Sequence, residues 1–288
     1  MLIGLNDICD MAEQRGSSIV AFNTPSFEAI RAAIDAAEMT DEPIIIAHAE
    51  EHEAFAPIKY FGPAIVKLCE RSSAKICVHL DHASHLDVIA DALNMGFTGV
   101  MYDGSNLSYE ENLLNSQRAA RMCHSQGIGI ECELGSMGSR EAGSRVEGGT
   151  SEEAGAIYTD PDQAIDFINK TNLDALACSF GTVHGLYKGV PHLNLDIPRT
   201  IRNRVMVPLV MHGGSGITDD DYRRCIKAGI RKINYYTYGA TAAGEATFDW
   251  VQDPKHKPLF WHDITNQAYH ALLNNFVHMI KVCTGLSE

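Results

Sequence analysis

The stretch Lys75-Ile76-Cys77-Val78-His79-Leu80-Asp81-His82 is a largely apolar run that ends in an acid and an imidazole. Its first part predicts a buried strand at 75–80. Asp81 and His82 then place a candidate proton carrier beside a candidate metal ligand, which suits a site where a metal holds an oxygen while a carboxylate moves its proton. An Asp-His pair is a weak signal in a chain with 13 His and 37 Asp and Glu. It is strengthened by two further histidines, His184 and His212, which follow later strand-like runs beside glycines.

Composition limits the class of protein. The 288 residues, 45% of them hydrophobic, are enough for a sizeable core and predict one domain over 1–288. A net charge of −14 argues against a nucleic-acid partner, and no apolar run approaches the ~20 residues of a membrane span. The N-terminus lacks the basic segment of a signal peptide, and the scattered cysteines form no CxxC pair. We therefore expect a cytoplasmic protein with reduced thiols.

Short apolar runs alternate with helix-period segments along the whole chain. The predicted strands are 18–23, 43–48, 75–80, 99–103, 129–134, 175–180, 207–212 and 232–235. The predicted helices are 27–37, 64–70, 86–95, 110–126, 161–170, 197–203 and 219–227, with two terminal helices at 240–250 and 263–282. This alternation predicts an α/β protein, a TIM (β/α)₈ barrel with extra terminal helices. The alternative, an open doubly wound sheet, would need a glycine-rich phosphate turn after the first strand, which Phe22-Asn23-Thr24-Pro25 is not.

Polar residues fall at the C-terminal ends of the predicted strands. They are Asn23, Asp81, His82, Asp103, Glu133, His212 and Asn234, and His184 follows shortly after another strand. In a barrel these ends form one rim around one mouth, so residues far apart in sequence would converge on a single pocket.

With the strand ends laid out, the chain resembles the class II, metal-dependent ketose-bisphosphate aldolases, such as the fructose- and tagatose-1,6-bisphosphate aldolases. The resemblance runs from Phe22 to about Thr237 and more loosely to the end. It rests on His79-Leu80-Asp81-His82, Tyr102-Asp103-Gly104-Ser105, Glu131-Cys132-Glu133-Leu134-Gly135, Gly181-Thr182-Val183-His184-Gly185-Leu186-Tyr187-Lys188-Gly189, His212-Gly213-Gly214-Ser215-Gly216 and Lys232-Ile233-Asn234 with Thr237.

The resemblance implies a reaction centre. His82, His184 and His212 match the three histidines that hold Zn²⁺, and three neutral ligands with an open position suit a catalytic zinc. Asp81 matches the acid/base on the hydroxyl that becomes an aldehyde, and the metal stabilises the enediolate formed when the C–C bond breaks. Asp103 and Glu133 match carboxylates near the metal, which orient its ligands or form a second metal position.

A second acid is expected on the glycine-rich connection 135–157, which can act as a lid. The family pattern Gly-Gly-x-Glu-Asp-Gly aligns with Gly138-Ser139-Arg140-Glu141-Ala142-Gly143, so Glu141 is the first choice. Ala142 and Ser139 depart from the pattern, and Glu147 remains the alternative.

The resemblance also implies a site for the phosphate of dihydroxyacetone phosphate. Its residues are Gly185, Lys188, Gly213, Gly214, Ser215, Asn234 and Thr237, with a monovalent cation, Na⁺ or K⁺, on the backbone carbonyls of Val183, Gly185 and Gly213. Glycines let backbone N–H groups approach a phosphate closely.

The distal half of the substrate site departs from the family. Tyr236 stands where smaller residues are usual, and Ala47-His48-Ala49 replaces the usual Gln-x-Ser. An acidic cluster, Glu50-Glu51-His52-Glu53, follows, and would repel a second phosphate. Asn23, His48 and Tyr236 are the expected distal contacts, although these departures are also compatible with packing or surface roles.

Three functions are thus compared. The first is a zinc-dependent aldolase of carbohydrate metabolism acting on a phosphorylated ketose, either a bisphosphate or a ketose 1-phosphate or keto-sugar acid phosphate without the distal phosphate. The second is a zinc hydrolase on a barrel, disfavoured because the first strand carries no His-x-His. The third is a non-catalytic sugar-phosphate binding subunit. The resemblance implies a homodimer or homotetramer, and Phe276, Val277, Met279 and Ile280 could form an interface or core.

Overall fold

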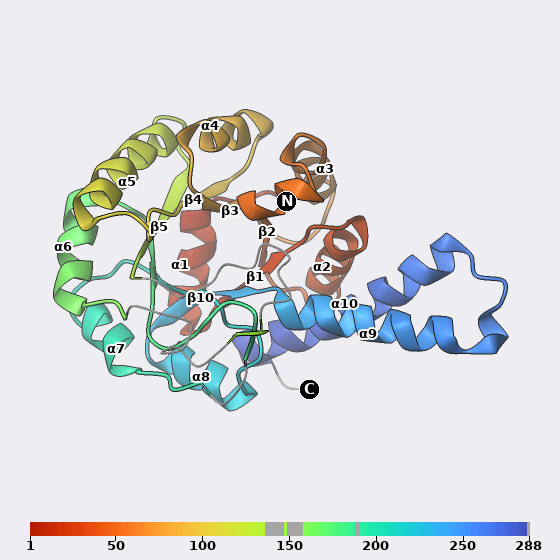
Figure 1. Ribbon diagram of the computed structural model, residues 1–288. Coiled ribbons are helices and arrows are strands. Elements are labelled where there is room, and N and C mark those ends of the chain that lie inside the picture. The colour runs from red at the N-terminus through yellow and green to blue at the C-terminus, as the bar shows by residue number, and fades with distance from the viewer. Residues whose placement is uncertain (136–146, 149–157, 188–190, 287–288) are drawn as a thin grey trace.

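The structure is a computed structural model that describes residues 1–135, 147–148, 158–187 and 191–286. Its centre is a closed barrel of parallel strands in the order β1-β10-β9-β7-β5-β4-β3-β2 (Figure 1). The barrel strands are β1 (Ile19–Asn23), β2 (Ile44–Ala49), β3 (Ile76–Ala83), β4 (Gly99–Tyr102), β5 (Gly129–Leu134), β7 (Ala175–Cys178), β9 (Leu209–Met211) and β10 (Ile230–Tyr235). The predicted TIM barrel is confirmed.

Helices surround the barrel and bury the outward faces of its strands. They are α2 (Phe27–Thr40), α3 (Ile58–Glu70), α4 (Leu86–Met95), α5 (Tyr109–His124), α6 (Pro161–Thr171), α7 (Asp196–Arg202) and α8 (Asp219–Lys227). Local signals set their starts: Ser26, Ser108, Asp160 and Thr218 each accept a backbone N–H of the first turn. Short 3₁₀ helices lie at Glu50–Ala54 (η1) and Pro254–His256 (η2).

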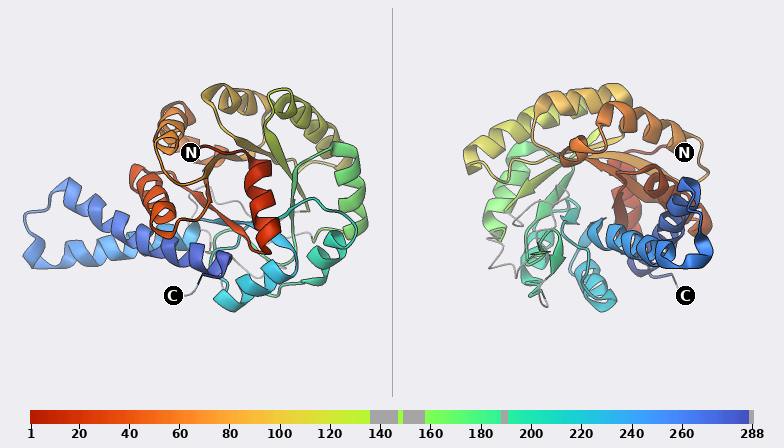
Figure 2. Two further views of the ribbon diagram at one scale, coloured as in Figure 1. Left: turned by 180° about the vertical axis from the view of Figure 1, so that it is seen from behind. Right: turned by 45° about the vertical axis from the view of Figure 1, so that its right-hand side comes forward.

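An N-terminal helix that the sequence analysis did not predict closes the base of the barrel. This helix, α1 (Leu5–Arg15), lies across the end opposite the rim (Figure 2). Leu5, Ile8, Cys9 and Ala12 face inward at helical spacing and form one apolar cluster with interior residues of the strands such as Met101. The periodicity was present in the sequence and could have identified the helix. The cluster makes the base of the barrel a packed core, so among the described residues this end offers no entry for a substrate.

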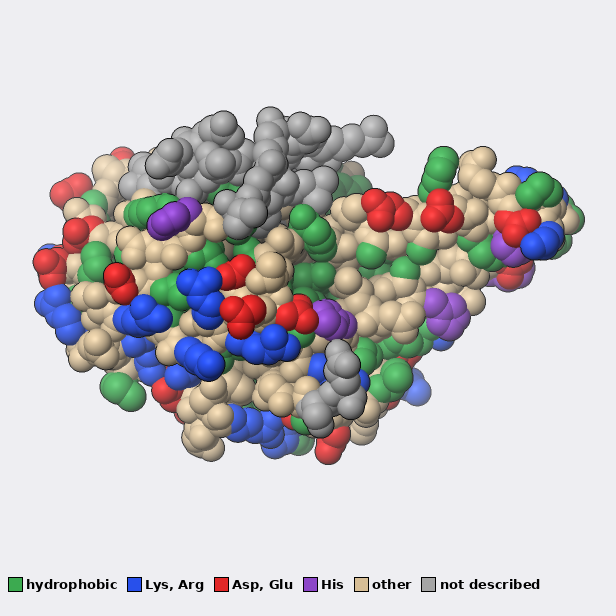
Figure 3. All heavy atoms as spheres, turned by 90° about the horizontal axis from the view of Figure 1, so that it is seen from below, with side chains coloured by type: hydrophobic (Ala, Val, Ile, Leu, Met, Phe, Trp, Pro, Cys, Tyr) green, Lys and Arg blue, Asp and Glu red, His purple; other side chains and the backbone are tan. Residues whose placement is uncertain are grey.

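The last two helices form an arm that projects from the barrel (Figures 1 and 3). They are α9 (Thr237–Gln252) and α10 (Trp261–Thr284). The inner part of α10 is core: Phe276 is 2% exposed and its ring stacks on Phe22 of β1 with 4.1 Å between centroids. Met279 and Ile280 are buried as well, so these side chains belong to the core rather than to an interface. Large exposed apolar residues lie further out, with Phe248 62% and Trp261 76% exposed.

Two further observations bear on the class of protein. Within the described residues, no helix has the length and apolar character needed to cross a membrane. All eight cysteines are buried and none forms a disulfide.

Candidate active site

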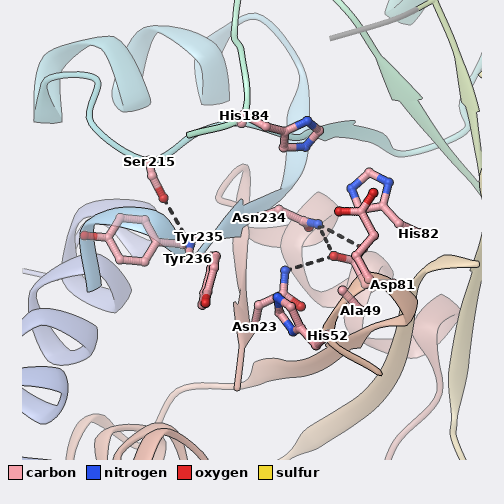
Figure 4. Close-up of a pocket in the computed structure, with 12 residues that line it drawn as sticks. Asn23, Ala49, His52, Asp81, His82, His184, Ser215, Asn234, Tyr235 and Tyr236 are labelled. Carbon is pink, nitrogen blue, oxygen red and sulfur yellow. Dashed lines mark hydrogen bonds between the residues drawn. The ribbon is translucent and has the colours of Figure 1, made fainter. Parts of the chain in front are cut away.

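A pocket opens at the C-terminal ends of the barrel strands (Figure 4). Its lining residues are Asn23, Ala49, Glu51, His52, Asp81, His82, His184, Gly213, Ser215, Asn234, Tyr235 and Tyr236. They come from β1, β2, β3, β10, η1 and the loops after β7 and β9. The structure thus brings together side chains that are more than 200 residues apart, as the barrel interpretation predicts.

A local irregularity in β3 lets two consecutive residues serve this pocket. Successive side chains of a strand normally point to opposite faces. Here the register between β3 and β4 shifts between Leu80 and Ala83, and His82 has a φ of 49°, in the left-handed region. The irregularity turns the His82 ring toward the rim while Asp81 still points into the barrel, so both reach the pocket.

Three histidine rings meet at the rim. Ring nitrogens of His82, His184 and His212 all lie within 4.8 Å of one another, and all three residues are buried. Both ring nitrogens of His184 are buried without a hydrogen-bond partner among the described residues. Burial lowers the pKa of His184 well below its usual range, so the ring is neutral and its lone pair is available. These orphaned nitrogens fit a divalent metal, because a buried polar atom without a partner is costly.

Asp81 lies beside this triad and is fully buried. Its carboxylate accepts hydrogen bonds from the Asn23 amide at 2.9 Å and from the Asn234 amide at 3.0 and 3.2 Å (Figure 4). Burial opposes its ionisation, but the nearby His82 and His212 hold its pKa well below the usual range. An ionised carboxylate held by two amides is ready to accept a proton.

The surroundings of the triad are strongly anionic. Asp81, Asp103, Glu131 and Glu133 are all at most 3% exposed, and among the described residues Lys232 is the buried cation that accompanies them. Asp103 accepts a hydrogen bond from His82 Nδ1 at 2.8 Å, and Glu133 lies 3.9 Å from the same nitrogen. Although burial favours neutral His82, Asp81, Asp103 and Glu133 raise its pKa to about 10. This excess of negative charge favours a cation among the three rings. His82, Asp103 and Glu133 form a second group whose potential ligand atoms lie within 4.8 Å of one another.

On one side of the triad, the loops after β7 and β9 approach each other closely. A Cβ at Gly213, whose φ is +60°, would lie 2.4 Å from the carbonyl oxygen of Val183, so only glycine fits there. Ser215 Oγ accepts a hydrogen bond from the backbone N–H of Tyr236 at 3.0 Å. Thr237 begins α9 directly after Tyr236, so a helix N-terminus also lies at this side of the pocket.

On the other side, aromatic rings line the pocket. Tyr236 packs on His52 of η1, with 5.1 Å between ring centroids. His48 is 1% exposed and stacks on Phe61 of α3, so it lies behind the wall while His52 lines it. The members of the acidic cluster have different surroundings. Glu50 accepts hydrogen bonds from the Ser84 backbone N–H and from His85, and Glu53 accepts one from the Ile58 backbone N–H. Glu51 lines the pocket.

The sequence analysis quoted four further residues of this region without assigning them a role in the site. His52 was grouped with the acids around it, and the short helix η1 that aims it at the pocket has no clear sequence signal. His79, Glu131 and Lys232 are wholly buried inside the barrel, directly below the rim. Their alternation with Asp81, Glu133 and Asn234 along β3, β5 and β10 could have identified them, because residues two apart in a strand face the same side.

Two of the expected residues, Glu141 and Lys188, lie outside the described part of the chain. The alternative acid, Glu147, lies in the two-residue strand β6 (Glu147–Gly148), which pairs with β8 (Leu186–Tyr187). Its backbone partner is Leu186, two residues beyond His184. Both candidate acids therefore lie in the connection between β5 and α6.

Comparison with known proteins agrees with this geometry. A model of the family "Fructose-bisphosphate aldolase class-II" matches residues 4–285. The protein YdjI of Escherichia coli K12, described as uncharacterized, is 35% identical over 234 residues, which is 81% of each chain. A fructose-bisphosphate aldolase of Staphylococcus aureus is 30% identical over 260 residues, covering 88% of this chain and 87% of that protein. The crystal structure of the E. coli YdjI aldolase superimposes with a TM-score of 0.85 at 29% identity, over 98% of this chain and 97% of the other.

Proposed function

The chain belongs to the class II fructose-bisphosphate aldolase family, and we propose that it is a zinc-dependent aldolase that reversibly cleaves a phosphorylated ketose to dihydroxyacetone phosphate and an aldehyde. One observation carries the proposal. The three buried histidine rings have nitrogens within 4.8 Å of one another, close enough to hold one metal ion, beside an ionised carboxylate held by two amides. That combination is suited to moving a proton next to a charge that a metal stabilises.

His82, His184 and His212 would hold the metal, which supplies Lewis-acid stabilisation of the charge that develops on the ketose as its C–C bond breaks. Asp81 accepts the proton of the hydroxyl group that becomes the aldehyde, and it returns this proton in the reverse direction. Asn23 and Asn234 orient its carboxylate, and Asp103 orients the His82 ring. Glu133 lies close enough to assist as a second orienting group or as an alternative ligand.

The triose carbon left by C–C cleavage must take up a proton. Glu141 is our first candidate for the acid that delivers it, and Glu147 is the alternative. Both lie on the segment between β5 and α6, so a Glu141→Gln and a Glu147→Gln variant can be compared directly. Detritiation of dihydroxyacetone phosphate isolates this step, and the variant that loses exchange while it retains zinc identifies the acid.

The phosphate of the triose would lie on the side of Gly213 and Ser215. Gly185, Gly213 and Gly214 offer backbone N–H groups, Ser215 and Thr237 offer hydroxyl groups, and Lys188 would add a positive charge. Asn234 would contact the triose hydroxyls in addition to Asp81. The family resemblance also implies a monovalent cation, Na⁺ or K⁺, on the carbonyl oxygens of Val183, Gly185 and Gly213, and the loops that carry Val183 and Gly213 lie close together.

The distal side favours an aldehyde fragment that carries no phosphate. Among the described residues that line the pocket, none is Lys or Arg, whereas Glu51 is acidic. Burial lowers the pKa of His52 to about 4, so its ring is neutral at pH 7 and provides no charge for a phosphate. Tyr236 and His52 instead form an aromatic wall against which a sugar chain can pack. We therefore favour a ketose 1-phosphate or a keto-sugar acid phosphate over a bisphosphate.

We also propose that the protein assembles as a homodimer or homotetramer through the arm formed by α9 and α10. The exposed Phe248, Phe260 and Trp261 on this arm support the proposal, because large apolar side chains exposed on a projecting arm favour burial against a partner. Light scattering of the wild type and of a Phe248→Ser/Trp261→Ser variant tests it. A wild type that is monomeric at micromolar concentration would refute it.

The competing function is a sugar-phosphate binding subunit without catalysis, suggested by Ala142 and Tyr236. A panel assay separates the two. Purified, zinc-loaded protein is offered fructose 1,6-bisphosphate, tagatose 1,6-bisphosphate and the corresponding ketose 1-phosphates, and release of dihydroxyacetone phosphate is followed by a coupled enzyme. Release supports the aldolase, and the fastest substrate tests the distal assignment. Tight binding of a panel sugar phosphate without release would support the binding subunit.

A further inference from the structure

Directly below the rim, the barrel interior holds a buried ion pair. Lys232 Nζ of β10 lies 2.8 Å from Glu131 Oε2 of β5, and both side chains are completely buried. A fully buried lysine is rare in proteins and is retained only with partners. Lys232 contacts Glu131 and Asn234, and these two residues contact His212 and Asp81.

The first connection runs through Glu131 to a candidate metal ligand. The other oxygen of this carboxylate, Oε1, lies 2.7 Å from Nε2 of His212. A carboxylate that faces an ammonium group at 2.8 Å acts as an acceptor of hydrogen bonds, so His212 carries its proton on Nε2. Nδ1 of the same ring faces the Asn234 amide nitrogen at 3.1 Å and His82 Nε2 at 2.9 Å. His212 therefore presents a bare Nδ1 toward the triad, which is the nitrogen that a metal can use.

The second connection runs through Asn234 to Asp81. Lys232 Nζ donates a hydrogen bond to Asn234 Oδ1 at 2.7 Å. An ammonium group only donates, so it fixes the amide oxygen on its own side and turns the amide nitrogen toward Asp81. If the amide were reversed, Asn234 would place its oxygen against the carboxylate of Asp81 and its N–H₂ group against the ammonium.

We propose that Lys232 is a positioning residue that sets the direction of the hydrogen bonds at both ends of the reaction centre. Through Glu131 it fixes His212 as an Nδ1 ligand, and through Asn234 it fixes Asp81 as a proton acceptor. This inference rests on the metal site of the proposed function. It adds that one buried cation, which touches neither metal nor substrate, determines which atoms are donors and which are acceptors.

The test exchanges Glu131 for an amide of the same shape. In Glu131→Gln the side chain has one acceptor and one donor end, and Lys232 requires the acceptor. The N–H₂ group then faces His212 Nε2 and favours the proton on Nδ1, where it blocks the metal. We expect zinc affinity, measured by competition with a chromophoric chelator, to fall by about 10- to 100-fold.

The decisive variant is Glu131→Gln/Lys232→Met. Without the ammonium group, the amide oxygen can turn to His212 and restore the wild-type tautomer. Removal of both charges also avoids the loss of stability expected when one member of a buried pair is left alone. Zinc affinity should recover to within a few-fold of the wild type. The tautomer of His212 is read by ¹⁵N NMR of the histidine rings in the metal-free proteins. The His212 proton should lie on Nε2 in the wild type, on Nδ1 in Glu131→Gln and again on Nε2 in the double variant.

The tautomer readout separates positioning from charge, because a simple change of net charge would alter zinc affinity without moving the proton of His212. Met101→Leu, a volume-conserving change inside the same barrel, is the matched control and should leave zinc affinity unchanged. Wild-type affinity in Glu131→Gln, or no recovery in the double variant, would overturn the inference while the metal site stands. A wild type that binds no zinc would refute the proposed function and this inference together.

Discussion

The two sides of the pocket are built differently. On the metal side, hydrogen bonds fix the side chains around the triad: Asp81 is held by Asn23 and Asn234, His82 by Asp103, and His212 by Glu131. On the distal side, the wall consists of aromatic rings placed by packing, chiefly Tyr236 on His52. Under the proposed function, the metal side would specify the reaction and the distal side would select the substrate. Substitutions on the two sides should therefore fail in different ways.

The largest effect is expected at His184, whose two ring nitrogens have no other described partner. His184→Ala removes one of the three proposed ligands, so zinc affinity should fall by more than the ~100-fold typical of a lost orienting group, and release of dihydroxyacetone phosphate should disappear. Metal content after dialysis and the coupled assay measure the two quantities. Turnover that survives without bound metal would contradict the assignment of this side.

Asp81→Asn should affect catalysis without affecting the metal. The amide has nearly the shape of the carboxylate but cannot accept the hydroxyl proton, so kcat should fall by about 10²- to 10⁴-fold. Zinc content and KM should change little, because Asp81 is not one of the three proposed metal ligands. A loss of zinc as large as the loss of kcat would show instead that Asp81 holds the metal and does not act only as a base.

On the distal side, Tyr236→Ala should alter preference more than rate. Opening the wall gives a larger aldehyde end more room, and such pocket changes are worth about 1–3 kcal/mol. The ratio of kcat/KM for fructose 1,6-bisphosphate to that for fructose 1-phosphate should rise roughly tenfold, with zinc content unchanged. Tyr60→Ala, which alters an exposed tyrosine of α3, is the matched control. Equal losses on both substrates would place Tyr236 in the reaction centre.

The smallest effect concerns stability behind the distal wall. Burial lowers the pKa of His48 from 6.5 to about 4, so the unfolded chain binds a proton between these values that the folded chain does not. Folding stability therefore falls as the pH drops through this window, by about 2 kcal/mol between pH 7 and 5 for one such histidine. Urea unfolding of His48→Gln should show a correspondingly smaller loss. His262→Gln, at an exposed position, should lose as much stability as the wild type. If His48→Gln also loses as much free energy of unfolding between pH 7 and 5 as the wild type, this explanation is wrong.

The sequence predicted the barrel well because alternating apolar runs and helix-period segments are direct consequences of burial. It also predicted that His82, His184 and His212 converge, since they follow strands that share one rim. It did not predict how consecutive Asp81 and His82 reach the same pocket, because a register shift in β3 is a property of the sheet. The place of His52 depends likewise on η1, a short helix with a weak local pattern.

The charged layer formed by Glu131 and Lys232 was harder to foresee for a different reason. Each residue lies in an apolar strand, and the sequence does not show which opposite charge could pair with it. The closed barrel brings the two side chains together. Their roles depend on contacts between β5 and β10, which lie on different parts of the barrel wall.

The central claim is that metal and carboxylate act together to cleave a phosphorylated ketose. The most direct measurement is release of dihydroxyacetone phosphate from the substrate panel by the zinc-loaded protein, before and after chelation. We predict release that stops on chelation, returns with zinc, and is fastest with a ketose that lacks the distal phosphate. Release that persists in the chelated protein, or zinc-loaded protein that binds panel sugars without cleaving them, would contradict the claim.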